Sequence, residues 1–274
     1  MRLQEIKIGF IGGGNMAAAM IQGLLKAGVA ARQIVVSEPD DGRQQWLQTQ
    51  YGVGVSGSNS VVVQSGAEVV ILAVKPGKVS SVLQALQADW QTGQLLISIA
   101  AGVALAQLQA LLPAGQPVVR VMPNTPALIG EGIAALYAAP SLSVAQRQTA
   151  RALLEVSGEV VEIEDEGWMD GVTALSGSGP AYVYLIAEAL SDGGVACGLP
   201  RPLADRLAIR TLIGSARLLD ASGSHPGVLK NQVTSPGGTT IAGLIRLETA
   251  GVRGALIEAV QAAWQRSRTL SGKS

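Results

Sequence analysis

The sequence contains one cysteine and one histidine in 274 residues. Cys197 has no second cysteine with which to form a disulfide within the chain, and a Cys-x-x-Cys site is excluded as well. Because His225 is the single histidine, the sequence argues against a zinc site, and we expect no metal. His225 also lies in a His-Pro-Gly segment that is typical of a turn and a helix start.

The sequence also has no excess of positive or of negative charge. Lysine plus arginine number 20 and aspartate plus glutamate also number 20, without a basic run or stripe. This balance argues against nucleic acid and against an anionic membrane surface as partners. We therefore expect the partners to be a small-molecule substrate and further copies of the same chain.

Long hydrophobic runs are absent, although 48% of the residues are hydrophobic and only 15% are charged. The longest strongly apolar runs, such as Val69–Val74, have the length of a strand and fall short of the roughly 18 residues of a membrane span. The N-terminal apolar stretch is interrupted at Gly9 and does not match a signal peptide. We expect a cytoplasmic protein whose surplus apolar surface is buried between subunits.

A dinucleotide-binding motif opens the chain. The apolar segment Ile6–Ile11 predicts a short buried strand, and Gly12-Gly13-Gly14-Asn15-Met16-Ala17 separates it from a helical pattern. In this motif the first glycine allows a tight turn, the second admits a pyrophosphate, and the small last residue lets helix pack on strand. The sequence thus predicts a cofactor site that includes Ile11, Gly12, Gly13, Gly14, Asn15 and Met16.

Strand and helix signals alternate over the first part of the chain, which predicts a parallel sheet covered on both faces. The expected strands are Ile6–Ile11, Ile34–Ser37, Val69–Val74, Leu95–Ile99 and Val118–Met122, with helices at Val79–Leu86 and Leu105–Leu112. Ile133–Tyr137 and Val160–Ile163 are expected as additional edge strands around a helix at Val144–Val156. We assign the α/β fold class, with an N-terminal Rossmann-type dinucleotide-binding domain at residues 1–164.

Strand signals vanish after the acidic segment Glu162–Glu166. Pro180 and Pro202 each begin a pattern of apolar residues at helical spacing, and two more helical patterns follow, the last at Val252–Leu270. Residues 165–274 therefore form an all-α C-terminal domain, which we expect to bind substrate and to mediate dimerisation.

The adenosine end of the cofactor is predicted at Val36-Ser37-Glu38-Pro39-Asp40. An acidic residue after the second strand usually accepts hydrogen bonds from the ribose of NAD, so Ser37 and Glu38 are candidates. Glu38 would repel a 2′-phosphate, whereas Arg43 could swing back toward one. NAD(H) and NADP(H) both stay open, as does a purely solvated turn.

Three further segments follow strands, at the edge where open α/β sheets bind ligands. Ala73, Val74, Lys75 and Pro76 come after one strand, Ala100 after the next, and Asn124 after a third. Lys75 is either a donor on the phosphate side or simply exposed. Asn124 either orients the nicotinamide carboxamide or makes the turn before a proline-bounded loop.

Two clusters of hydroxyl and glycine residues occupy the C-terminal half, at Ser176–Tyr182 and Thr234–Thr240. Each precedes an apolar helical pattern, and a helix N-terminus with hydroxyls attracts an anion. Ordinary N-capping is the alternative for each cluster taken alone. Together they predict a cradle for a small carboxylate, formed by Ser176, Ser178, Ser235, Gly237, Gly238, Thr239 and Thr240.

The chemistry suggested by these clusters is reduction of a C=N bond. Removing an alcohol proton usually needs a histidine, lysine or tyrosine, but hydroxyls outnumber titratable groups in both clusters. An iminium is already electrophilic, so hydride addition needs orientation more than a strong base. A threonine hydroxyl could hydrogen-bond the ring nitrogen as it becomes an amine.

The sequence resembles the pyrroline-5-carboxylate reductase family. Ile-Gly-Gly-Gly-Asn-Met, Ala-Val-Lys-Pro, Arg-Val-Met-Pro-Asn-Thr-Pro and the two hydroxyl clusters occur in the family's order across nearly the whole chain. The resemblance implies reduction of 1-pyrroline-5-carboxylate to L-proline with NAD(P)H, the last step of proline synthesis. It also implies interlocked dimers, which in the family are often joined into larger rings.

The resemblance also implies roles for single residues. The loop from Ser235 to Thr240 would bind the substrate carboxylate, with Thr240 touching the ring nitrogen as the catalytic residue. Glu166 would lie near the substrate amine, and Asn59 near the adenosine phosphate.

Two positions depart from the family pattern. Glu38 stands where members that favour NADPH can carry a hydroxyl residue, and Gly223-Ser224 replaces an acid found before His-Pro-Gly in some relatives. Two alternatives stay open: a dehydrogenase similar to the β-hydroxyacid dehydrogenases, and a non-catalytic dinucleotide sensor. The former carry a lysine and an asparagine about one helical turn apart, whereas Lys230 and Asn231 are adjacent.

Overall fold

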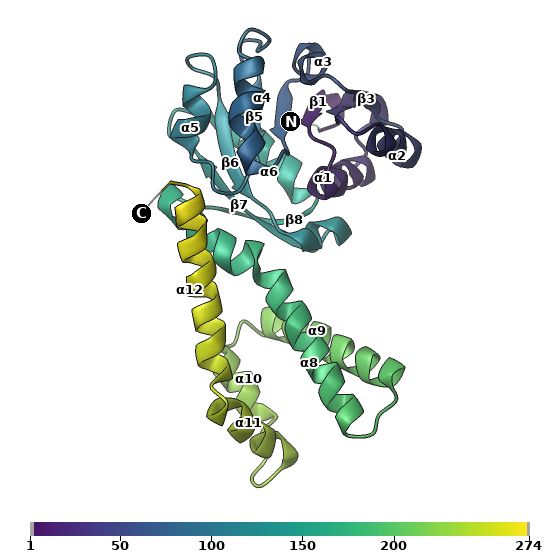
Figure 1. Ribbon diagram of the computed structural model, residues 1–274, viewed down its shortest axis with the longest axis vertical. Coiled ribbons are helices and arrows are strands. Elements are labelled where there is room, and N and C mark those ends of the chain that lie inside the picture. Colours follow the sequence, from purple (N-terminus) through teal and green to yellow (C-terminus); the bar gives the residue numbers. More distant parts are fainter. Residues whose placement is uncertain (1–2, 273–274) are drawn as a thin grey trace. The chain divides into compact units, whose positions relative to one another are not determined.

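The computed structural model describes residues 3–272 and divides them into two compact units. The first unit holds the chain up to Ser178 together with the segment from Ala263 onward, and the second holds Gly179–Ala262. Figure 1 labels the elements of both units.

An eight-stranded sheet forms the centre of the first unit, in the order β3-β2-β1-β4-β5-β6-β7-β8. The strands are β1 (Ile8–Ile11), β2 (Ile34–Ser37), β3 (Gly54–Ser56), β4 (Val69–Leu72), β5 (Leu95–Ser98), β6 (Val118–Met122), β7 (Gly132–Ala138) and β8 (Gly158–Glu162). Its first six strands are parallel and follow the order 3-2-1-4-5-6 of dinucleotide-binding folds. The strand order reverses between β1 and β4, which places a ligand crevice at that point.

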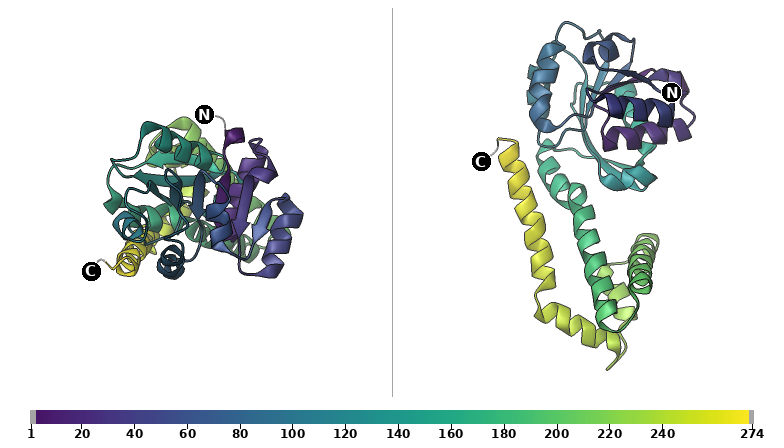
Figure 2. Two further views of the ribbon diagram at one scale, coloured as in Figure 1. Left: turned by 90° about the horizontal axis from the view of Figure 1, so that it is seen from above. Right: turned by 45° about the vertical axis from the view of Figure 1, so that its right-hand side comes forward.

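Helices flank this sheet on both sides, as the right-hand view of Figure 2 shows. They are α1 (Asn15–Lys26), α2 (Asp41–Tyr51), α3 (Asn59–Gln64), α4 (Val79–Ala85), α5 (Leu105–Ala110) and α6 (Val144–Glu155). Every residue of β1, β4 and β5 is buried, because both faces of a central parallel strand are covered. Ile8, Phe10 and Leu72 belong to the resulting core.

The strand predictions hold with two differences. The short strand β3 was not expected; its three residues include a glycine and a serine, too few apolar positions for a recognisable pattern. The expectation that Ile133–Tyr137 forms an edge strand is wrong, because β7 lies between β6 and β8. β7 pairs antiparallel with β6 and parallel with β8.

Helical structure begins again after β8 and continues to the end of the described chain. In the first unit, α7 (Met169–Val172) is followed by a π-helical turn over Thr173–Gly177. The last residues of α12 (Val252–Leu270) also belong to this unit. There, buried Asp170 accepts hydrogen bonds from the hydroxyls of Ser267, at 2.7 Å, and Ser271, at 3.3 Å.

The second unit consists of helices: α8 (Gly179–Ala196), α9 (Arg201–Ser222), α10 (Pro226–Gln232), α11 (Thr239–Thr249) and the first part of α12. Small residues let α8 and α9 approach closely, as at Gly194 and Ala204. Between α11 and α12, Arg253 donates to Glu248 at 2.6 Å, and this hydrogen bond and charge lower the pKa of the Glu248 carboxyl.

The second unit has almost no core of its own. Within it, the residues the structure describes as buried are Ser191, Ala204 and Ala208. Large apolar side chains are instead exposed along its helices, including Tyr184, Leu185, Leu207, Leu218 and Ile257. Among the described residues, no helix is both long enough and apolar enough to cross a lipid bilayer.

Candidate active site

The glycine-rich turn after β1 has the geometry that its sequence predicts. Gly12 has a φ of 97°, and its N–H donates to the carbonyl of Ser37 at 2.8 Å. A Cβ at Gly12 would lie 2.6 Å from the carbonyl oxygen of Ala73, so a side chain is excluded both by conformation and by space. Helix α1 then begins at Asn15 with Gly14 as an N-cap that makes no side-chain hydrogen bond. The start of α1 is thus available to a phosphate, and this turn fits a dinucleotide.

Glu38, predicted from the sequence for the adenosine end of the cofactor, is held at this turn by two backbone N–H groups. Its Oε2 accepts a hydrogen bond from the Gly13 N–H at 2.9 Å, and its Oε1 accepts one from the Asp40 N–H at 3.2 Å. The carboxylate is therefore fixed beside the phosphate-binding turn. Nearby, the Ser37 hydroxyl donates to Asn59 Oδ1 at 2.6 Å, which joins two residues predicted for the adenosine end.

Arg43 is held at the same turn. Its Nε donates to the Gly13 carbonyl at 2.7 Å, and its guanidinium stacks on the Trp46 ring at 4.1 Å from the centroid. The Nη2 atom of Arg43 is buried without a hydrogen-bond partner. One acidic and one basic side chain thus both contact Gly13, at the turn where the sequence predicts the adenosine end of the cofactor.

A cavity of about 370 Å³ lies at the carboxyl ends of β4, β5 and β6, next to the same turn. Seven of the predicted cofactor residues line it: Gly14, Asn15, Met16, Ala73, Val74, Lys75 and Asn124. It is also lined by Met122 and by Gly177, which belongs to the first hydroxyl cluster; neither was predicted as a site residue. Ala100, which follows β5, is buried, but it does not line this cavity.

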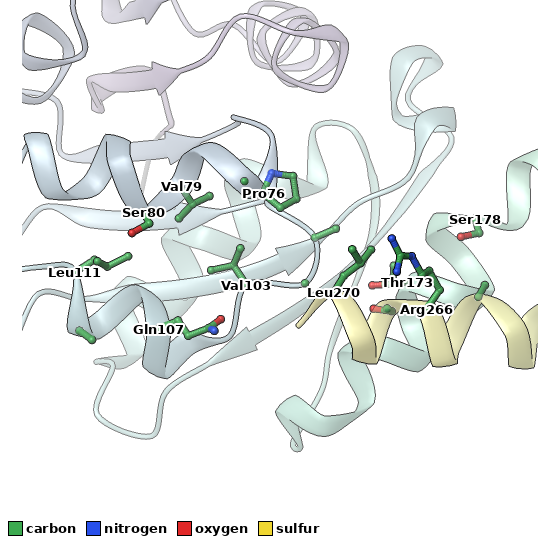
Figure 3. A pocket seen from close by; sticks show the side chains of 16 residues that line it. Pro76, Val79, Ser80, Val103, Gln107, Leu111, Thr173, Ser178, Arg266 and Leu270 are labelled. Atoms are coloured by element: carbon green, nitrogen blue, oxygen red, sulfur yellow. The ribbon is translucent and has the colours of Figure 1, made fainter. Parts of the chain in front are cut away.

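A larger, mostly apolar cavity of about 920 Å³ lies in the same unit (Figure 3). Its labelled side chains come from α4 and the preceding Pro76, from α5 and its flanking residues Val103 and Leu111, from the end of α12, and from the segment with Thr173 and Ser178. Pro76 and Ser178, predicted for cofactor and substrate respectively, both line it. This cavity was not predicted from the sequence, because its walls come from segments far apart in the chain.

Glu166 is fixed by two donors. Its Oε1 accepts from the Leu105 N–H at 2.6 Å, at the first residue of α5, and from Arg120 Nη1 at 2.8 Å. The Arg120 side chain, on β6, is only 3% exposed. This arginine was not predicted as a site residue, although a charge in the apolar strand Val118–Met122 indicates a partner, since a buried charge is costly when unpaired.

The first hydroxyl cluster is not the free helix N-terminus that the sequence suggested. Ser176 lies within the π-helical turn, and its hydroxyl donates to the Val172 carbonyl at 2.9 Å. The Ser178 N–H donates to the Thr173 carbonyl at 2.8 Å. Helix α8 does begin next to Pro180. Helical turns precede it, however, and the Ser176 hydroxyl and the Ser178 N–H donate to carbonyls of those turns. π-turns of this kind are frequent at functional sites.

The second cluster, in the other unit, is a true helix start. Helix α11 begins at Thr239 with Gly238 as an N-cap that makes no side-chain hydrogen bond, so its first N–H groups are not capped by a side chain. Thr240 is half-buried, whereas Ser235 and Gly237 are exposed. The preceding Thr234 hydroxyl is occupied by the Lys230 carbonyl at 2.6 Å.

The described residues contain no group of three or more histidine, cysteine, aspartate or glutamate side chains that could hold a metal ion. The dinucleotide-type sheet, the glycine-rich turn and the helical C-terminal region together define a class, the two-domain nicotinamide-dependent oxidoreductases.

Two family models match separate parts of the chain. Residues 7–102 match the model described as NADP oxidoreductase coenzyme F420-dependent, and residues 166–270 match the one described as pyrroline-5-carboxylate reductase dimerisation. The C-terminal region is thus a dimerisation domain of the pyrroline-5-carboxylate reductase type.

Full-length relatives carry the same name. A pyrroline-5-carboxylate reductase from Synechocystis is 46% identical over 98% of this chain and 100% of its own length. One from Pseudomonas aeruginosa is 42% identical over 97% of each. The crystal structure of the Plasmodium falciparum enzyme with NADP bound is 32% identical and aligns with a TM-score of 0.89, over 98% of this chain and 99% of that one. The chain belongs to the pyrroline-5-carboxylate reductase family.

Proposed function

We propose that this protein reduces 1-pyrroline-5-carboxylate to L-proline with NAD(P)H, as the last step of proline biosynthesis. The observation that carries the proposal is the shared cavity, because Gly14 of the dinucleotide turn and Gly177 of the first hydroxyl cluster both line it. A reduced nicotinamide there would be adjacent to the segment that distinguishes this family. Relatives named for this activity over nearly the full chain support the same reaction.

The bound cofactor would supply a hydride to the carbon of the C=N bond in its protonated, iminium form, whose nitrogen already carries the proton that the amine product keeps. The residues of this chain then have to orient the imine and stabilise its nitrogen as a lone pair develops there. We assign this role to the Thr240 hydroxyl, which would donate to the ring nitrogen. Ser235, Gly237, Gly238 and Thr239 would hold the substrate carboxylate at the start of α11, where anions are favoured.

Glu166 and the first cluster complete the proposed site. Glu166 Oε1 is occupied by Leu105 and Arg120, so the substrate amine would meet Oε2. Ser176 and Ser178 are proposed to approach the substrate from the π-helical turn. Ile11, Gly12, Gly13, Ser37, Glu38, Asn59, Pro76 and Ala100 complete the proposed cofactor site, together with the seven predicted residues that line the smaller cavity.

We further infer that two copies pair through the helical region, that the dimers join into a larger ring, and that the enzyme works in the cytoplasm without nucleic acid or membrane partners. The exposed apolar side chains of the second unit support pairing. The equal numbers of acidic and basic residues support the absence of polyanionic partners.

The direct test mixes the protein with pyrroline-5-carboxylate and either NADH or NADPH, and follows both the absorbance of the reduced nicotinamide and the formation of proline. Stoichiometric loss of reduced cofactor and gain of proline is the expected result. Reactions without the imine, and reactions with a β-hydroxyacid and oxidised cofactor, are the controls. Turnover of the β-hydroxyacid without proline formation would overturn the proposal.

A further inference from the structure

Asn124 is the asparagine that follows β6 and lines the cavity of about 370 Å³. Its Oδ1 accepts a hydrogen bond from the backbone N–H of Ile133, on β7, at 2.9 Å. A backbone N–H can only donate, so the side-chain atom that faces it must be the amide oxygen. The neighbouring strand therefore decides which way round this amide sits.

The consequence is a fixed donor at the cavity wall. With Oδ1 turned toward Ile133, the two hydrogens of Nδ2 point elsewhere, and in the described part of the chain no acceptor bonds to Nδ2. The β7 strand lies between two other strands, so the Ile133 N–H is a rigid reference for the orientation of this amide. Asn124 thus presents a donor, and not an acceptor, to whatever occupies the cavity.

The position of this donor indicates what it meets. The phosphate-binding turn follows β1, and β4 and β5 separate β1 from β6 in the sheet. Three strand spacings amount to about 14 Å, so Asn124 lies well away from the phosphate-binding turn, on the side of the cavity where a nicotinamide would extend. Between these points the cavity is lined by Ala73, Val74 and Ile99, which suit the apolar faces of a ribose and a nicotinamide.

We propose that Asn124 Nδ2 donates a hydrogen bond to the carboxamide oxygen of the nicotinamide and so fixes the rotation of the carboxamide in the site. This inference rests on the proposed function only in taking a nicotinamide as the occupant. A ribose hydroxyl would be served by either orientation of the asparagine amide, since a hydroxyl both donates and accepts. The nicotinamide carboxamide distinguishes the two orientations of the Asn124 amide, because the carboxamide oxygen only accepts hydrogen bonds and its nitrogen only donates them.

The test is the isosteric variant Asn124→Asp, examined by binding rather than by turnover. Aspartate keeps an oxygen for the Ile133 N–H, so the fold is retained, but it presents a second oxygen to the cavity. We expect NADH, measured by its fluorescence on binding, to bind about 10–100-fold more weakly, as a lost donor and a new repulsion predict. ADP-ribose, which lacks the nicotinamide, should bind equally to both proteins, and Gln148→Glu, at an exposed position of α6, is the control for the added charge.

The reduced 3-acetylpyridine analogue of NADH identifies the atom that Asn124 recognises. The analogue keeps the carbonyl oxygen and replaces the amide nitrogen by a methyl group. If Nδ2 contacts the oxygen, the unmodified protein binds the analogue within about threefold of NADH, a difference below 1 kcal/mol, and Asn124→Asp weakens both ligands alike. Undiminished NADH binding by Asn124→Asp with intact ADP-ribose binding would overturn the proposal, as would loss of the analogue in the unmodified protein.

These measurements are independent of the reaction. A protein that binds NADH as described but fails to reduce pyrroline-5-carboxylate would refute the proposed function and leave the role of Asn124 standing. A protein that reduces the imine but whose Asn124→Asp variant binds NADH normally would refute the role of Asn124 and leave the proposed function standing.

Discussion

At the scale of single residues, the carboxylate of Glu38 bears on the choice between NADH and NADPH. It is held by the Gly13 and Asp40 N–H groups, so it cannot easily turn away from a 2′-phosphate. We expect Glu38→Ser to raise the preference for NADPH over NADH about tenfold, for roughly 1.4 kcal/mol of relieved repulsion. Ratios of kcat/KM for the two cofactors measure this, and an unchanged ratio would exclude Glu38 from cofactor selection.

Arg43 provides the matched comparison at the same turn. Its guanidinium has one buried nitrogen without a hydrogen-bond partner. Arg43 contacts the Gly13 carbonyl, whereas Glu38 contacts the Gly13 N–H, so both side chains are held at the same residue of the turn. Arg43→Ala should therefore shift the ratio in the opposite direction to Glu38→Ser. Equal shifts in one direction for both variants would show that the turn itself has been disturbed.

Thr240 is predicted to act mainly on the chemical step. Thr240→Val keeps the shape of the side chain and removes its donor, so kcat/KM should fall on the order of 10–1000-fold, as for other single donors to developing charge. Cofactor binding, measured by nicotinamide fluorescence, should be unchanged. A folded Thr240→Val protein with unaltered kinetics would remove this hydroxyl from the mechanism.

At the scale of elements, buried Asp170 ties the end of α12 to α7 through Ser267 and Ser271. Asp170→Ala removes the acceptor of the buried Ser267 hydroxyl, whereas the Ser271 hydroxyl keeps the Ser267 carbonyl at 2.9 Å. The free energy of unfolding should therefore fall by about 1–3 kcal/mol. Glu155→Ala, which breaks an exposed ion pair with Arg151 within α6, should cost about 0.5 kcal/mol or less. Denaturant titration measures both, and equal effects would contradict a specific role for Asp170.

The helical segment around Thr173–Gly177 shows why the boundaries of elements are harder to predict than their type. The serine, glycine and proline residues of Ser176–Tyr182 favour an N-cap when considered locally. In the structure the turn from α7 continues through them as a π-helix, and the Ser176 hydroxyl bonds back to Val172. Helical turns on both sides therefore override the local preference for a helix start.

At the scale of the whole molecule, the second unit has too few buried residues to be stable as an isolated monomer. Leu185 is 66% exposed on α8, and many large apolar side chains exposed along the helices of one unit indicate a subunit interface. We expect the protein to sediment as a dimer or larger, and Leu185→Glu to release subunits that lose reductase activity while still binding NADH. Val144→Glu, at an equally exposed valine at the start of α6, is the matched control. An active 28.0 kDa monomer at assay concentration would overturn this.

The sequence by itself determined the alternation of strands and helices, the dinucleotide turn and the all-helical C-terminal region. These depend on local physics: the periodicity of apolar residues, and the conformation that a residue such as Gly12 must adopt. The family motifs added the reaction, because their order along the chain can be read without a structure.

Tertiary structure alone decided the features that join distant segments. Arg120 meets Glu166 across 46 positions of the sequence, and β7 enters the sheet between β6 and β8. The orientation of the Asn124 amide likewise depends on a strand that begins after it in the chain. Hydrogen bonds of this kind are set by which chain segments pack side by side, and a local sequence pattern carries no record of its distant neighbours.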